Sequence, residues 1–183
     1  MQTMAKDRPA LPYRPCVGVC LINANGLVWL GRRAELEAEP DAGAWQMPQG
    51  GIDDGESADV AVLRELQEEI GTAQGTIIAK ISDWLPYDFP DFVPKKMRAK
   101  WRGQTQKWFL LRFTGQDSDI DVRGVAHPEF SAWRWATTAE AIALVVPFKR
   151  SIYEQVLHQF SDHLSSRSAK IERDQLRLNQ SKL

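Results

Sequence analysis

Residues 57–70 show the three- and four-residue spacing of apolar side chains that is typical of an amphipathic α-helix. The apolar residues are Val62, Leu63, Leu66 and Ile70. Such a stripe has to be covered by a hydrophobic core, so this helix cannot stand alone in water. Ser57 is a favourable N-cap, and Gly71 follows at the position where helices commonly end. The segment therefore predicts a helix that packs against a second layer of structure.

A second face of the same helix carries three acidic side chains. Glu65 and Glu69 are like charges four positions apart, and Glu68 stands beside them, which destabilises a helix unless a positive charge compensates. At about 100° per residue, the three carboxylates share an arc about 100° wide. Taken alone, they could be a solvated acidic face, but clustered carboxylates are also the ligands of Mg²⁺, which keeps waters and substrate phosphates in its shell. This face therefore indicates a metal site for hydrolysis of a phosphoanhydride.

The residues around the helix identify the pattern. Gly50 is followed by five residues and Glu56, then by seven residues and the segment 64–71, which reads Arg-Glu-Leu-Gln-Glu-Glu-Ile-Gly. This arrangement resembles the Nudix box in every charged and glycine position. Thr72 departs from the aliphatic residue that the family usually has there. The resemblance implies an α/β fold, the Nudix α/β/α sandwich with a mixed β-sheet between helices, and a hydrolase acting on phosphoanhydride bonds.

Each residue of this pattern also has a chemical reason to be there. Gly50 and Gly51 are expected to let the backbone turn tightly before the helix and to leave a carbonyl free as a metal ligand. Arg64 is within helical reach of Glu68 and is expected to fix the direction of that carboxylate. Glu56 precedes the helix and is expected to support this arrangement from the loop.

The resemblance implies a role for each acidic residue. Glu68 and Glu69 bind the metal, Glu65 is either a ligand or the base that takes the proton from water, and Glu129 is an extra acid from a later loop. The implied cofactor is Mg²⁺, for which Mn²⁺ or another divalent cation can substitute. The predicted catalytic residues are Glu56, Arg64 and Glu65, and the predicted metal ligands are Gly50, Glu65, Glu68, Glu69 and Glu129.

Segments outside the box resemble one subfamily, the bacterial RNA 5′-pyrophosphohydrolases and dinucleoside polyphosphate hydrolases. These segments are 13–15, 45–51, 104–109, 128–130, 133–135 and 146–150. Two departures are a longer acidic loop at 34–44 and the lack of a long basic tail. The resemblance implies hydrolysis of the 5′-triphosphate end of RNA to a 5′-monophosphate with release of pyrophosphate. The alternative is cleavage of diadenosine tetraphosphate or a related dinucleotide.

Basic and aromatic residues are the candidates for holding such a substrate. Four cations are expected to neutralise phosphates: Arg14, Arg32, Arg33 and Lys107. Tyr87, Phe148 and Lys149 are expected to stack on and contact the first base. The basic residues of the segment 86–102 either contact RNA or merely keep a long loop soluble. They are Lys95, Lys96, Arg98, Lys100 and Arg102.

Strand and helix patterns follow one another along the chain without an internal repeat. Asn-Gly at 25–26, between two apolar runs, predicts a hairpin of strands at 16–22 and 27–30, and 86–102 is expected to be a long loop. Further strands are expected at 45–47, 76–84, 107–113 and 130–135, and helices at 138–145 and 147–164. The expected organisation is a flexible N-terminal segment (1–12), a Nudix hydrolase domain (13–164) and a charged C-terminal tail (165–183).

The composition of the 183 residues excludes several classes of protein. A formal net charge of −1 with 43% hydrophobic residues is that of an ordinary soluble globular protein, so any RNA contact has to be a local basic patch. Cys16 and Cys20 would lie on one face of a strand about 13 Å apart, too far to bridge. The lack of an apolar leader and of a span of about 20 apolar residues predicts a cytoplasmic protein without membrane contact. A monomer is favoured.

Two interpretations from other functional classes are open. A catalytically silent nucleotide-binding module would keep the fold, although silent relatives typically lose the acids, and Glu65, Glu68 and Glu69 are all present. A structural, partner-binding protein would rest on the charged segment 165–183 alone.

Overall fold

A mixed eight-stranded sheet forms the centre of the computed structural model, which describes residues 11–38, 40 and 42–164. The tail predicted at 165–183 and most of the segment predicted at 1–12 lie outside these residues. The strands are β1 (Tyr13–Ile22), β2 (Val28–Arg33), β3 (Trp45–Gln46), β4 (Gln49–Gly51), β5 (Gly75–Lys80), β6 (Leu85–Asp88), β7 (Gly103–Phe113) and β8 (Phe130–Ala136). The helices are α1 (Ala58–Ile70), α2 (Lys95–Lys100), α3 (Thr138–Leu144) and α4 (Arg150–Gln159), with 3₁₀ turns η1 (Ala34–Leu36), η2 (Asp117–Asp119) and η3 (Pro147–Lys149).

The two long strands β1 and β7 run parallel through the middle of the sheet, in register from Tyr13↔Gly103 to Ile22↔Arg112. The main path of the sheet is β3-β2-β1-β7-β5, while β4 pairs with β1, β6 with β7 and β8 with β2. Because successive side chains of a strand point to opposite faces, β1 supplies two separate cores. Val19 and Leu21 pack in the core beneath α1, and Cys20 and Ile22 pack in the core beneath α3 and α4.

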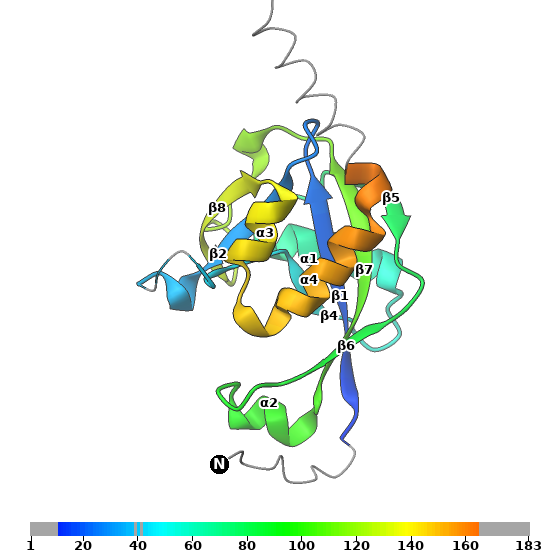
Figure 1. Cartoon of the computed structure of the whole chain (residues 1–183), viewed down its shortest axis with the longest axis vertical. Coiled ribbons are helices and arrows are strands. Elements are labelled where there is room, and N and C mark those ends of the chain that lie inside the picture. The colour runs from blue at the N-terminus through cyan, green and yellow to red at the C-terminus, as the bar shows by residue number, and fades with distance from the viewer. Residues whose placement is uncertain (1–10, 39, 41, 165–183) are drawn as a thin grey trace, which may run out of the picture.

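Helices cover both faces of this sheet (Figure 1), with α3 and α4 in front and α1 behind. Val62, Leu66 and Ile70 of α1 are fully buried against one face, as the apolar stripe predicted. The side chain of Ser57 accepts a hydrogen bond from Val60 N, and Gly71 ends the helix in the left-handed conformation (φ 84°). The predicted α/β/α sandwich with its mixed sheet is confirmed.

Four predicted elements differ from the structure. The Asn-Gly turn forms, but β1 and β2 pair only at Ile22↔Val28, and β4 pairs with residues 16–18 of β1. The segment 86–102 is not a long loop, since it contains most of β6 and all of α2. The helix expected at 147–164 begins as η3 and continues as α4, and the strand expected at 76–84 ends at Lys80.

The segment from β6 through α2 to the start of β7 forms an arm that leaves the sandwich together with the first residues of β1 (Figure 1). Asp88 holds these strands together, because its carboxylate accepts a hydrogen bond from Tyr13 Oη at 2.6 Å and two from Arg102 Nε and Nη2 at 3.0 Å. Across the described residues, no helix is both long and apolar enough to cross a lipid bilayer.

Candidate active site

Gly50 and Gly51 lie in the extended strand β4, so the prediction that they turn the backbone tightly is wrong. The turn before α1 contains Gly55 instead, whose φ is 80°. The two glycines are needed for a different reason, namely the close approach of side chains. A Cβ atom on Gly50 would overlap the carboxyl group of Glu65, and one on Gly51 would overlap the guanidinium of Arg14. The strand therefore leaves room for an acid and a cation at the start of the site.

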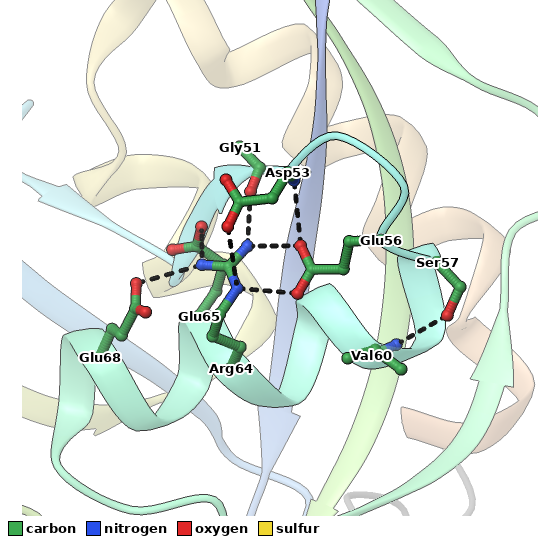
Figure 2. Close-up of polar contacts among 8 residues, drawn as sticks. All are labelled: Gly51, Asp53, Glu56, Ser57, Val60, Arg64, Glu65 and Glu68. Carbon is green, nitrogen blue, oxygen red and sulfur yellow. Dashed lines mark hydrogen bonds and ion pairs between the residues drawn. The ribbon is translucent and has the colours of Figure 1, made fainter.

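Arg64 is the centre of a hydrogen-bonded cluster between α1 and the loop before it (Figure 2). Its guanidinium donates to both carboxylate oxygens of Glu56 at 2.7 and 2.8 Å and to Gly51 O at 2.8 Å. The same group donates to Glu65 Oε1 at 3.0 Å and to Glu68 Oε2 at 3.1 Å. The expected contact between Arg64 and Glu68 is present. The carbonyl of Gly51 already accepts a hydrogen bond from Arg64.

Glu56 is kept ionised by this cluster. Its hydrogen bonds from Arg64, together with one from Asp53 N at 3.0 Å, lower the pKa of the Glu56 carboxyl to about 2. A carboxylate of such low basicity is a poor acceptor of a proton at neutral pH. Within the cluster, Glu56 is therefore suited to orienting Arg64, and Arg64 in turn fixes the carboxylates of α1.

Glu65 and Glu69 are unusual because they are buried acids, with only 8% and 4% of their surface exposed to solvent. Burial raises the pKa of Glu65, against the opposing effect of Arg64. Burial also raises the pKa of Glu69 well above its usual value, and the negative charge of Glu129 acts in the same direction. Glu69 accepts one hydrogen bond from Gln49 N at 2.9 Å. Both groups are consequently placed where a cation would stabilise their charged forms.

A cavity of about 580 Å³ separates the C-terminal half of α1 from the loop that precedes β8. Its lining contains four predicted acids, Glu65, Glu68, Glu69 and Glu129, together with His127 and Asp121. The structure thus brings together side chains that are up to 64 positions apart, from Glu65 to Glu129. The loop acid faces the helix acids across the cavity.

The donor set of this cavity fits a hard divalent cation. In the described part of the chain, no three His, Cys, Asp or Glu side chains already converge as a metal site, and Glu68 is turned toward Arg64. Mg²⁺ does not require such a cage, since it is commonly held by one or two carboxylates and completes its shell with waters and substrate phosphates. Buried Glu69 and nearby Glu65, with Glu68 and Glu129 at the rim, meet that requirement.

The residues predicted to contact a base divide into two environments. The ring of Phe148 packs against Tyr87, with centroids 5.8 Å apart, and against Phe92 at 5.5 Å, so these aromatics lie together. Lys149 points inward, is 3% exposed, and donates from Nζ to Gln46 Oε1 at 2.9 Å. Burial lowers the pKa of Lys149 to about 7, with Arg33 acting in the same direction.

The predicted phosphate-binding cations are not all together. Arg14 lies beside Gly51, and Arg33 contacts Gln46 and pairs with Glu35. The structure places Arg32 toward the acidic loop, where its Nη2 donates to Glu37 O at 3.0 Å. Lys107 contacts a different part of the structure, where its ammonium donates to Ser82 O and stands 5.9 Å from the centroid of the Trp84 ring.

A network of glutamines was not predicted from the sequence. Gln106 is fully buried, and its Nε2 donates to Gln49 Oε1 at 2.9 Å and to Gln104 Oε1 at 3.2 Å. Gln104 Oε1 also accepts from Tyr87 Oη at 2.8 Å. Since Gln49 N donates to Glu69, the network joins the aromatic residues to a buried acid. Its signal in the sequence is a pair of polar residues at alternate positions of β7, on the strand face that continues with buried Trp108 and Leu110.

Comparisons with known proteins find relatives over most of the chain. The RNA pyrophosphohydrolase of Roseobacter denitrificans is 51% identical over 157 residues, covering 84% of this chain and 95% of that protein. The protein of the same name from Rickettsia conorii is 44% identical over 161 residues, covering 87% and 97%.

Solved structures with the same fold include two hydrolases of low sequence identity. One is the Escherichia coli dihydroneopterin triphosphate pyrophosphohydrolase, with a TM-score of 0.59, 22% identity, and coverage of 80% of this chain and 99% of that one. The other is a Caenorhabditis elegans Ap4A hydrolase, with a TM-score of 0.56, 20% identity, and coverage of 82% and 98%. The family model described as the NUDIX domain matches residues 12–156. The chain therefore belongs to the Nudix hydrolase family.

Proposed function

We propose that this protein is a Mg²⁺-dependent RNA 5′-pyrophosphohydrolase, which converts a 5′-triphosphate end to a 5′-monophosphate and releases pyrophosphate. One observation carries the proposal: four acids line a single cavity, in a chain 51% identical to a protein named RNA pyrophosphohydrolase. An RNA substrate and two free, buried thiols favour a cytoplasmic location.

Glu68, Glu69 and Glu129 are the residues that would hold the cation, with the Gly50 carbonyl as a further ligand. When bound, Mg²⁺ supplies positive charge that neutralises the phosphate oxygens and lowers the pKa of an attacking water. Glu65 is our candidate for the base, because its pKa is raised by burial and it lines the same cavity. Arg64 holds Glu65 in place, and Glu56 holds Arg64.

The aromatic pair Tyr87 and Phe148 offers faces on which the first base of the RNA can stack. Burial raises the pKa of Tyr87, and the charges of Arg33 and Arg14 act against that rise, so both cations are within electrostatic reach of this ring. We assign them to the phosphates beyond the cation. Lys149 lies beneath this surface, with Nζ 5.6 Å from the centroid of the Phe148 ring, and its protonated form also acts on Glu69.

A second candidate is hydrolysis of diadenosine tetraphosphate, which is favoured by the likeness of the fold to the Caenorhabditis elegans Ap4A hydrolase. That reaction uses the same acids and requires a second base pocket. The silent-module interpretation is disfavoured, because the acids are present and share one cavity.

Turnover of triphosphorylated RNA and of diadenosine tetraphosphate, measured with one preparation of the full chain, decides between the substrates. We expect the larger kcat/KM for RNA, no activity in EDTA, and recovery with Mg²⁺. A strong preference for the dinucleotide would overturn the RNA assignment.

The metal site is tested with Glu69→Gln, and with Glu154→Gln on α4 as a control that removes the same charge elsewhere. Glu69→Gln is expected to lower Mg²⁺-dependent turnover by about 100-fold or more, and the control is expected to match the unaltered protein. Full activity of Glu69→Gln would show that the proposed site is wrong.

A further inference from the structure

The arm that leaves the sandwich (Figure 1) contains Lys95, Lys96, Arg98, Lys100 and Arg102. We call residues 85–103 the basic arm. Its five basic side chains fall into two groups. Arg102 is bound to Asp88, and Arg98 donates to Val93 O at 2.7 Å and to Asp91 Oδ1 at 3.4 Å. These two arginines therefore hold the arm together and are not available for a ligand.

The lysines of α2 form the second group. Lys95, Lys96 and Lys100 are exposed, whereas Met97 and Arg98 on the other side of the helix are half-buried. Among the described residues, none of the three lysines has an acidic partner within ion-pair distance. In a chain with a net charge of −1, this is a local concentration of uncompensated positive charge. A surface of this kind attracts a polyanion.

Aromatic side chains connect this surface to the proposed base-binding site. Phe92 stands just before α2, is 75% exposed, and contacts the ring of Phe148, which in turn contacts Tyr87. A large apolar ring exposed to this extent loses favourable burial unless a ligand covers it. The row Tyr87, Phe148 and Phe92 therefore leads from the site to the lysines of α2.

We infer that the basic arm binds the RNA downstream of the first nucleotide, with Phe92 stacking on a base and the α2 lysines contacting backbone phosphates. Stacking platforms beside a basic groove are the usual means of holding single-stranded nucleic acid without reading its sequence. The inference rests on the proposed function and adds to it, since it makes activity depend on the length of the RNA.

The test compares Lys95→Gln/Lys96→Gln with the matched control Lys80→Gln/Arg134→Gln, in which the two lost cations are exposed Lys80, paired with Asp59, and half-buried Arg134, paired with Glu140. The substrates are a triphosphorylated dinucleotide and an unstructured triphosphorylated decamer, assayed with Mg²⁺ at 50 to 200 mM salt. Loss of two phosphate contacts to a single strand reduces the slope of log affinity against log salt by about 1.4. Across this range, the KM of the unaltered protein for the decamer should therefore rise about 7-fold more than that of the arm variant.

Three results are expected together: a weaker, less salt-dependent use of the decamer by the arm variant, unchanged use of the dinucleotide, and unaltered behaviour of the control. Equal losses on both substrates, or no difference from the control, would overturn the inference while leaving the proposed function intact. If the unaltered protein cleaves neither RNA, the proposed function fails instead. Fluorescence anisotropy with a monophosphorylated decamer then tests the arm separately, and equal affinities of the two double variants would overturn it.

Discussion

Replacing Gly50 with alanine adds one methyl group at the point where β4 meets Glu65. The new Cβ would overlap the Glu65 carboxyl group, whereas an ordinary contact needs about 3.5 Å. The carboxylate cannot turn away freely, because it is bonded to Arg64 and is 8% exposed. It therefore has to move by about 1 Å or more, and a displacement of that size in a reacting group lowers the rate about 100-fold. We expect kcat to fall by this factor, with about 1 to 3 kcal/mol lost from the free energy of unfolding.

The matched control is Gly55→Ala in the turn before α1. Gly55 has a φ of 80°, and a Cβ there would meet nothing within 4 Å. Left-handed backbone destabilises an alanine by about 1 to 2 kcal/mol, so this variant should lose stability and keep its kcat. The measurements are initial rates of pyrophosphate release and urea unfolding of both variants. Near-normal kcat in Gly50→Ala, or equal loss of kcat in both variants, would refute the reasoning.

Three further predictions concern buried polar groups. Gln106→Leu leaves its hydrogen-bond partners unpaired and should lower the free energy of unfolding in urea by about 2 kcal/mol. Folding lowers the pKa of Lys149 from 10.5 to about 7, so the folded state holds fewer protons than the unfolded state between these pH values, and the free energy of unfolding should rise with pH there. The variant Lys149→Met should lack this rise in unfolding experiments. An identical pH profile in the variant would contradict the lowered pKa of Lys149. Burial raises the pKa of Cys16 to about 11 and that of Cys20 to about 12, so mass spectrometry should detect iodoacetamide adducts at pH 8 only after unfolding.

The helix α1 could be predicted from local sequence because its determinants are local. The apolar stripe, the Ser57 cap and the Gly71 end are all properties of consecutive residues. The Arg64–Glu68 contact follows from helical spacing in the same way. The rest of the sheet depends on distant segments. The pairing of β1 with β7 and the small overlap of β1 with β2 are decided by which surfaces are buried together.

The site shows the same division between local and distant information. Gly50 was predicted to turn because glycine is common in turns, whereas its actual role depends on Glu65, which lies on another element. Lys149 follows an aromatic residue and was predicted to contact a base, but its burial beside Gln46 comes from the position of η3 next to β3, where Val146 N also donates to Trp45 O. Spacing alone contains no information on either contact. The resemblance to a family supplied the acids, and only the folded chain shows what surrounds them.

The parallel pairing of β1 with β7 also has a consequence for synthesis on the ribosome. The paired residues Tyr13 and Gly103 are 90 positions apart, so the first strand leaves the ribosome long before its partner has been made. At about 5 to 20 residues per second, the delay is roughly 5 to 20 s. During that time β7 is not yet available to pair with β1, whose residues Val17, Val19 and Leu21 are fully buried in the finished domain. The nascent β1 strand therefore needs protection from aggregation during this delay.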